Sequence, residues 1–447
     1  MPRNSGSDTH TSGSGAQNGV TRRTALRTAA GTAGAAGLVG LAGCVGGFGG
    51  GGSDDPKPST LTIGLTRSNT GSYVYSSTKG FRGVKLWQRN VNENGGIEVD
   101  GESMDVELVT YDDRSSKQRV TRLYETLINE DNVDVLFAPF GSTLTSAAAA
   151  VASKNDKFLM AWSAADPSIY DQGYDNLVSS EVPSTRLLNG QFPVMKRAGV
   201  KSIAVLHLDA GFTSTLADTI KREAPKKNIE VVHNESYAET TSDFSSTLRD
   251  IDSKDPDAFF VSAYTGGCID IMRQMKENDV WFDWVHSYYS QSSQFYNALG
   301  PDAMYAYGAH NIHPDLKRDV DIGLSVGDFI SQYREMFGGD DPQFGTTNAY
   351  SAGLALGEAV KRSGATRDTG ALVDAAVDLN GNTLTYGPWD INPDKGFQKT
   401  SLGQYITPQN QHTGGSSQYE RFEVVGPNSH VTPTADPAYP APGWNER

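Results

Sequence analysis

Cysteine is scarce in this sequence: the 447 residues include only two, Cys44 and Cys268. Two cysteines cannot form a disulfide-stapled scaffold, so buried apolar cores must hold the fold together. Hydrophobic residues make up 37% of the chain, which suffices for such cores and excludes a wholly disordered protein. We expect Cys268, near a predicted helix start, to be a small buried residue.

Basic residues are also in the minority. The chain has 38 Lys and Arg against 53 Asp and Glu, which gives a formal net charge of −15 at pH 7. Nucleic acid is not an expected partner, because phosphates attract clusters of Lys and Arg and the sequence has no such cluster. A strongly acidic surface keeps a protein soluble in concentrated salt, which points to a halophilic source.

The familiar motifs of catalysis and nucleotide binding are missing. The sequence has no G-x-S-x-G nucleophile elbow and no Walker A motif. His310, His313 and Asp315 have a spacing that suits a metal, but solvent-exposed loop histidines are the better interpretation. Asn234-Glu235-Ser236 fits an N-glycosylation acceptor, although such triplets also arise by chance. We therefore predict no cofactor, no metal site and no enzymatic activity.

The start of the chain has the features of an export signal followed by a tether. Arg22–Arg23 precedes an uncharged run, residues 28–43, that is too short and too weakly apolar to span a bilayer comfortably. Paired arginines before such a run resemble a twin-arginine signal, and Leu41–Cys44 resembles a lipobox with a lipidated cysteine. We predict a signal peptide over residues 1–43 and a flexible Gly-rich tether over 44–59. The alternative is an uncleaved membrane anchor.

From Leu61 onward, short apolar strands alternate with amphipathic helices. Leu61, Ile63 and Leu65 alternate as in a strand, and the apolar residues that follow recur at helical spacing. The same rhythm resumes at Ile203–His207. Strand–helix alternation predicts an α/β fold with parallel sheets covered on both faces. The length favours two or three compact units, and two runs joined near residues 178–183 indicate two lobes.

Several segments in the first part of the chain show a family resemblance through their order and spacing. They are Asn69–Gly71, Gly80–Gly83, Asn92–Ile97, Tyr111–Asp113 and Val133–Ser142. Together they resemble the periplasmic leucine/isoleucine/valine-binding protein family, the substrate-binding components of ABC importers. The resemblance implies a type I periplasmic-binding fold, with two Rossmann-like lobes joined by a multi-strand hinge. The expected segments are an N-terminal lobe at 60–180 plus 311–388, a C-terminal lobe at 181–310 plus 389–430, and an irregular tail at 431–447.

Ser142 is the candidate ligand residue with the most direct physical argument. It falls on the family's serine that holds the ligand carboxylate. Gly141, Ser142 and Thr143 follow a predicted strand and open a predicted helix, so free backbone N–H groups and the helix dipole face the cleft. The alternative is that Ser142 or Thr143 is an ordinary helix N-cap, and the two roles can coexist.

Other positions follow from the resemblance. Ser163 falls on the position that gives a backbone carbonyl to the ligand, and Phe212 and Tyr264 fall on cleft aromatics of the second lobe. Two positions depart from the family: Ala165 replaces a threonine that contacts ammonium and carboxylate, and Tyr288 replaces an acid that receives an ammonium group. A phenol cannot neutralise a cation, although its ring face attracts one. Further possible ligand contacts are Tyr73, Tyr75, Trp162 and Asp209, with Tyr289 in the same aromatic group.

These observations predict an extracytoplasmic solute-binding lipoprotein of an ABC importer. A twin-arginine signal would export it, and a lipid on Cys44 would hold it at the extracellular face of the cell membrane. Its partners would be a small amino-acid-like, carboxylate or amide ligand, bound by hinge closure, and the permease subunits. The alternatives are a secreted ligand-sensing domain and, with less support, a secreted α/β hydrolase.

The two departures also predict the class of ligand. An ammonium group buried without a carboxylate partner is unfavourable, so the cleft favours one carboxylate or amide on an apolar or aromatic body. We expect weak or no binding of leucine, isoleucine and valine, and tighter binding of an aromatic acid, a short-chain acid or an amide. Asp209 or the aromatic rings would have to supply the missing attraction for a cation.

Overall fold

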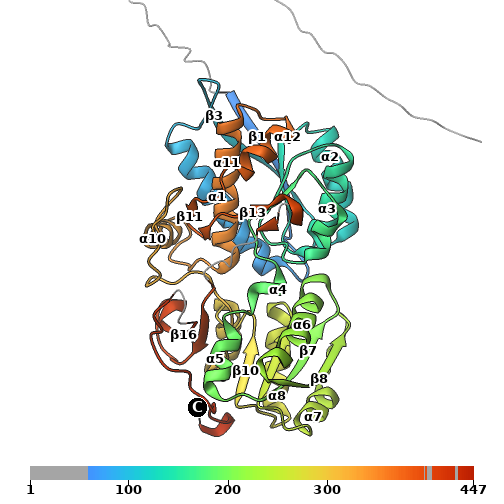
Figure 1. The fold of residues 1–447 in the computed structure, drawn as a ribbon, viewed down its shortest axis with the longest axis vertical. Helices are drawn as coiled ribbons and strands as arrows, with labels where there is room; N and C mark the ends of the chain where they lie inside the picture. Colours follow the sequence, from blue (N-terminus) through green and yellow to red (C-terminus); the bar gives the residue numbers. More distant parts are fainter. Residues whose placement is uncertain (1–58, 397, 400–404, 428–430, 447) are drawn as a thin grey trace, which may run out of the picture. The chain divides into compact units, whose positions relative to one another are not determined.

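The computed structural model describes residues 59–396, 398–399, 405–427 and 431–446. The predicted signal peptide, Cys44 and the tether up to residue 58 lie outside these residues. No helix within the described ranges is long and apolar enough to cross a bilayer. Figure 1 shows two α/β lobes in the described part of the chain.

The first lobe is built on an eight-stranded sheet. From one edge to the other, its strands are β13 (Ile391–Asn392), β14 (Gln398–Lys399), β6 (Leu177–Ser179), β5 (Leu159–Ala161), β4 (Val135–Phe137), β1 (Ser59–Arg67), β3 (Glu102–Asp112) and β2 (Ile97–Val99). Strand β1 pairs in parallel with β3 on one side and β4 on the other. Its residues Leu61, Ile63 and Leu65 are buried, as their alternation predicts.

Helices cover both faces of this sheet. They are α1 (Val74–Glu93), α2 (Lys117–Asn129), α3 (Ser142–Lys154), α10 (Val326–Met336), α11 (Phe344–Ser363) and α12 (Thr369–Val377), with a small hairpin of β11 (Thr383–Leu384) and β12 (Gly387–Pro388). Strand β3 lies on one side of β1 and strand β4 on the other, so the connections β1–α1–β3 and β3–α2–β4 run in opposite directions across the sheet. Because such crossovers are right-handed, α1 and α2 cover opposite faces of the sheet (Figure 1). Helices α1 and α11 approach so closely that a Cβ at Gly83 would lie 2.2 Å from the carbonyl oxygen of Thr346.

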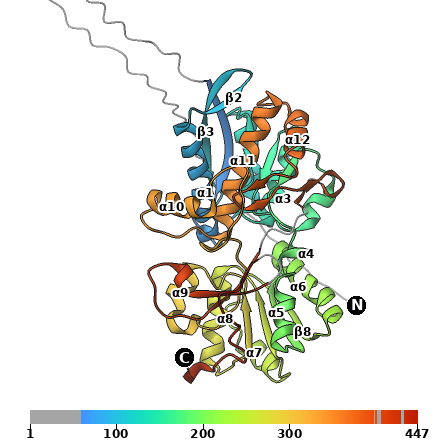
Figure 2. The ribbon, with the colours of Figure 1, turned by 60° about the vertical axis from the view of Figure 1, so that its left-hand side comes forward.

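The second lobe, coloured green to yellow in Figure 2, has a four-stranded parallel sheet. Its strands are, in order, β10 (Trp284–Ser287), β9 (Ala258–Ser262), β7 (Ser202–Leu208) and β8 (Glu230–Tyr237). Its helices are α4 (Ser184–Leu187), α5 (Gln191–Ala198), α6 (Gly211–Glu223), α7 (Ser245–Asp252), α8 (Thr265–Glu277) and α9 (Ser293–Leu299). The hairpin of β15 (Thr407–Asn410) and β16 (Phe422–Gly426) continues the sheet, because Tyr307 bridges β10 to β15. Cys268 is buried in α8, as expected.

The chain passes between the lobes three times: after β6, near His310–His313, and after β14. The last passage lies later than the expected boundary at residue 388, because β13 and β14 extend the first-lobe sheet and β14 pairs with β6. Two-residue strands are too short to produce an alternating pattern, so the sequence gives no indication of them. The described tail, residues 431–446, has no strand and packs on the second lobe, with the Trp444 ring 5.0 Å from that of Trp281.

His310 and His313 lie at the second passage and are buried, not exposed as the sequence suggested. Their rings pack against Tyr419 and Phe422, next to the β15–β16 hairpin. No group of three or more His, Cys, Asp or Glu side chains that could hold a metal occurs in the described part of the chain.

Candidate functional site

A small pocket lies where strand ends of the two lobes face each other. About 10 Å³ of open space remains between its lining side chains, roughly the room that one water molecule needs. Its lining residues come from both lobes and from the first passage between them: Phe140, Gly141, Ser142, Ser163, Ala165, Glu181, Leu187, Phe212, Tyr264, Tyr288, Tyr289 and Phe344. Loops at the carboxyl ends of parallel strands are the usual place for a ligand in α/β folds.

The first lobe contributes the N-terminus of α3 to this pocket. Gly141 precedes the helix with a φ of +84°, a conformation that favours glycine, and no side chain caps the helix. The backbone N–H groups of its first turn therefore have no intrahelical partner. Ser142 is the first helical residue rather than the N-cap, and its Oγ accepts a hydrogen bond of 3.1 Å from the Asp166 N–H. The N-cap alternative is therefore wrong for Ser142, which joins the helix start to the loop after β5.

The second lobe points a hydroxyl at the same helix start. Tyr264 precedes α8 and is 6% exposed. Its Oη makes no well-aligned hydrogen bond among the described residues, with the Tyr73 side chain as its polar neighbour. A Cβ built on Gly141 would lie 3.7 Å from this oxygen. Backbone N–H groups of one lobe and a hydroxyl of the other therefore converge, and a carboxylate is the group that accepts from both.

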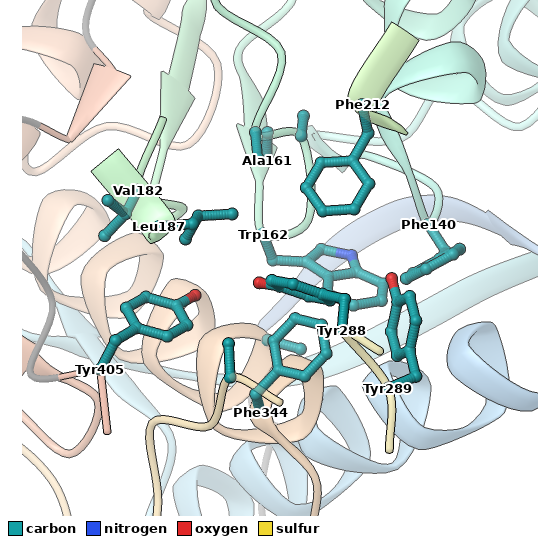
Figure 3. Close-up of a cluster of buried hydrophobic side chains, with 14 of the residues drawn as sticks. Phe140, Ala161, Trp162, Val182, Leu187, Phe212, Tyr288, Tyr289, Phe344 and Tyr405 are labelled. Carbon is teal, nitrogen blue, oxygen red and sulfur yellow. The ribbon is translucent and has the colours of Figure 1, made fainter. Parts of the chain in front are cut away.

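The rest of the pocket wall is aromatic. Tyr288 lies edge-to-face against Phe212, with ring centroids 5.3 Å apart, and against Phe344, at 5.5 Å. Tyr289 packs on the same Phe344 ring at 5.7 Å. Figure 3 shows these rings gathered with Phe140. Burial raises the pKa of Tyr288 well above 10, so the phenol stays neutral and presents rings and a hydroxyl rather than a charge.

Tyr73 and Trp162, two of the predicted ligand contacts, do not line the pocket but pack against the side chains that do. The Tyr73 ring packs 4.8 Å from the Tyr264 ring. Trp162 is buried, donates from Nε1 to the Ala138 carbonyl at 2.9 Å, and packs on Phe140 at 5.8 Å (Figure 3). Both residues fix the position of a lining ring.

Three other predicted residues also lie outside the lining. Thr143 is half-buried in the first turn of α3. The Tyr75 hydroxyl accepts a hydrogen bond from the Gln343 side-chain amide. Asp209 is exposed and does not bring its carboxylate to the pocket. The predicted rescue of a cation by Asp209 therefore has no support from the geometry.

A match to the periplasmic binding protein family spans residues 60–402. The chain belongs to that family. Its members and the structures below are solute-binding proteins rather than enzymes, in agreement with the missing catalytic motifs.

Solved structures of such binding proteins have the same fold. The branched-chain amino acid binding protein LivJ of Streptococcus pneumoniae, solved with isoleucine, shares 20% identity with a TM-score of 0.68, and the match covers 83% of this chain and 100% of that one. A solute-binding protein of Rhodopseudomonas palustris, solved with benzoate, shares 18% identity with a TM-score of 0.70, covering 86% and 99%. The leucine-binding protein LivK of Thermotoga maritima shares 18% with a TM-score of 0.69, covering 79% and 97%.

Sequence reasoning missed four lining residues: Phe140, Glu181, Leu187 and Phe344. Phe140 directly precedes the Gly141 turn, so its place next to Ser142 could have been inferred. Glu181 follows the end of β6, as the other site loops follow their strands, but the segment around it resembles a linker. Its carboxylate in the pocket wall corrects the expectation of a cleft without an acid.

The two lobes touch each other outside the pocket as well. Ser72 Oγ donates to Glu239 Oε1 of the second lobe at 2.7 Å. A Cβ on Gly211, the first residue of α6, would lie 2.7 Å from Asp166 Oδ2 of the first lobe. All its lining residues except the half-buried Ser163 are buried, so the second lobe closes the pocket.

Proposed function

We propose that this chain is the solute-binding component of an ABC importer and binds a small organic carboxylate or amide between its lobes. One observation carries the proposal: the buried Tyr264 hydroxyl points at the uncapped start of α3, inside a pocket that both lobes close. A carboxylate there accepts hydrogen bonds both from the backbone N–H groups at the start of α3 and from the Tyr264 hydroxyl.

Binding is coupled to closure in this proposal. Ser142, Ser163 and Ala165 belong to the first lobe, and Phe212, Tyr264 and Tyr288 to the second. A ligand that contacts both groups stabilises the closed arrangement over any open one, which is the basis of a population shift on binding. The closed form is then the form that the permease subunits recognise.

The proposal includes export and anchoring. The family is that of periplasmic binding proteins, and the twin-arginine run and the lipobox at Leu41–Cys44 supply the route and the anchor. Replacing Cys44 with Ser should leave the folded domain intact but release it from the membrane or block its maturation. Cell fractionation measures this, and unchanged membrane association of Cys44→Ser would contradict the anchor.

Thermal shift over a library of carboxylates, amides and amino acids tests the binding function. A ligand that binds only the folded protein raises its melting temperature. Calorimetry of the best ligand with wild type and Tyr264→Phe then tests the site. The variant removes a hydroxyl that makes no well-aligned hydrogen bond within the described protein, so stability without ligand should change little. Its affinity should drop about 10- to 150-fold, the loss of one hydrogen bond to a charged group. Equal affinities would remove the Tyr264 hydroxyl from the site.

A further inference from the structure

The lobes also meet at a place whose residues do not line the pocket. The loop between α10 and α11 in the first lobe contacts the turn between β15 and β16 in the second, and Figure 1 shows this hairpin directly beneath α10. Asp341 and Pro342 on one side and Ser417–Tyr419 on the other form what we call the Asp341 contact. The Asp341 side chain is 6% exposed, and a carboxylate so buried needs hydrogen-bond donors around it.

Donors from both lobes hold the Asp341 carboxylate. Oδ2 accepts from Ser417 Oγ at 2.9 Å and from the Gln418 N–H at 2.7 Å, and both donors belong to the second lobe. Oδ1 accepts from Arg334 Nε of α10 at 2.7 Å, and Arg334 Nη2 also donates to Ser417 Oγ at 2.8 Å. Hydrogen bonds to a charged group are stronger than neutral ones, so this carboxylate joins the two lobes firmly.

Pro342 extends the contact toward the hinge. Its carbonyl accepts from Gln418 Nε2 at 2.7 Å and from the Tyr419 hydroxyl at 2.9 Å. The Tyr419 ring packs against His310 and His313 of the second passage, with ring centroids 6.2 and 5.8 Å away. The contact therefore lies beside the hinge, and a rotation of one lobe against the other separates its donors from its acceptors. Such hydrogen bonds are lost beyond about 3.5 Å.

The first-lobe side of the contact continues into the pocket wall. Lys79 of α1 donates to the Asp340 carboxylate at 2.5 Å and to the Asp341 carbonyl at 3.0 Å, which ties the loop to the first lobe. Three residues after Asp341, Phe344 begins α11, and its ring packs on that of Tyr288 of the second lobe at 5.5 Å. The loop therefore connects a contact between the lobes to a residue that lines the pocket.

We propose that Asp341 is a positioning residue that holds the lobes closed and keeps Phe344 against the second lobe. Asp341 is not among the described residues that line the pocket, so it acts without touching a ligand. Opening breaks its bonds with Ser417 and Gln418, and the contact therefore slows the release of any ligand, whatever the chemistry of that ligand. The effect on binding rests on the proposed function, whereas the effect on closure does not.

Small-angle X-ray scattering on the full chain without ligand tests whether the Asp341 contact holds the lobes closed. Asp341→Asn keeps the shape of the side chain but removes its charge and one acceptor, so its radius of gyration should exceed that of wild type. Tyr419→Phe loses the hydroxyl that binds Pro342 and should shift the radius the same way by less. Asp315→Asn is the matched control, because this exposed carboxylate lies in the same surface groove and pairs with His313 of its own passage, so its removal should leave the radius unchanged.

Release rates measured by stopped flow test the effect on binding. The probes are isoleucine and benzoate, which two of the similar structures contain, and the best compound of the thermal-shift library. Asp341→Asn should release each bound probe at least about tenfold faster, and Tyr419→Phe about two- to tenfold faster, with association rates nearly unchanged. The factor should be the same for every probe, since Asp341 touches none of them.

An unchanged or smaller radius of gyration in both Asp341→Asn and Tyr419→Phe overturns the proposal. Slower association with an unchanged release rate also overturns it, because a distorted pocket would produce that result. Tyr419→Phe decides the question alone if Asp341→Asn does not fold. If wild type binds no carboxylate or amide at all, the proposed function fails, while the scattering comparison still decides whether the Asp341 contact holds the lobes closed.

Discussion

The two lobes share one architecture, but Asp113 in the first and His286 in the second are buried in opposite surroundings. In the first lobe, the Asp113 carboxylate is fully buried and accepts from Thr66 Oγ1 at 2.9 Å and Ser68 Oγ at 2.6 Å. In the second lobe, His286 on β10 is equally buried, stacked on Phe260 with ring centroids 4.2 Å apart, and neither ring nitrogen has a hydrogen-bond partner among the described residues. The polar atoms of Asp113 are thus satisfied by donors, whereas burial lowers the pKa of His286 and keeps its ring neutral.

Acid should therefore weaken the second lobe and the hinge first, and this is the largest effect we expect. Burial lowers the pKa values of His286 and His310 from 6.5 to about 3. Because the folded-state pKa lies below the unfolded one, the unfolded chain binds protons first as the pH falls. The stabilisation is complete above about pH 6.5 and is lost toward pH 3. At pH 5 the loss is about 2 kcal/mol for each histidine, or about 4 kcal/mol for both.

Urea unfolding at pH 7 and pH 5 measures this loss. His286→Phe keeps the stacking on Phe260 and removes one titrating group, so the difference between the two pH values should fall by about half. Wild type and variant with the same pH dependence would show that His286 gains its proton without unfolding.

The second prediction contrasts the two polar groups that meet at the start of α3. Ser142→Ala removes a hydroxyl that also accepts from the Asp166 N–H, so it should lower both stability and affinity. We expect about 1 kcal/mol in unfolding free energy and a 10- to 150-fold loss of affinity, about 1.5–3 kcal/mol. Tyr264→Phe, in the other lobe, should affect mainly affinity, since its hydroxyl makes no well-aligned hydrogen bond within the described protein. Denaturation and calorimetry on both variants give the comparison, and a Ser142→Ala protein with wild-type affinity would contradict it.

The sequence predicts the strands and the loops that follow them better than it predicts the segments that pass between the lobes. Leu61, Ile63 and Leu65 indicate β1 by simple alternation, and the loop between a predicted strand and a predicted helix supports Ser142, whereas Tyr264 was named through the family resemblance. These features are local, so the sequence contains them. Whether the predicted residues bind ligand remains a prediction.

Glu181 illustrates what local patterns cannot reveal. Its place in the pocket depends on Tyr405 and Asn348, more than 150 residues away along the chain. His310 was expected to be exposed because nothing near it in the sequence shows that Phe422 of the returning hairpin covers it. Burial created by distant segments has no periodicity, and the passages between lobes are where it concentrates.

The smallest effect we expect comes from Gly211→Ala, which changes a contact between the two lobes without touching the ligand. Gly211→Ala adds a Cβ 2.7 Å from Asp166 Oδ2, across the contact between the lobes. That oxygen is the end of a side chain and can move aside, so we expect only about two- to fivefold weaker binding, below about 1 kcal/mol. In an open arrangement the new methyl meets no carboxylate, and alanine favours the helix over glycine, so unliganded stability should stay equal or rise.

Gly266→Ala in α8 is the control for this last change, because a Cβ there has no atom within 4 Å and should leave affinity unchanged. Calorimetry and thermal unfolding on the two variants separate the effects: weaker binding without lower stability indicates that the contact at Gly211 belongs to the closed form alone. If Gly211→Ala binds as tightly as wild type, the contact with Asp166 does not contribute to closure of the two lobes. The free energy of closure must then come from the ligand, from the aromatic rings that line the pocket and from the Asp341 contact.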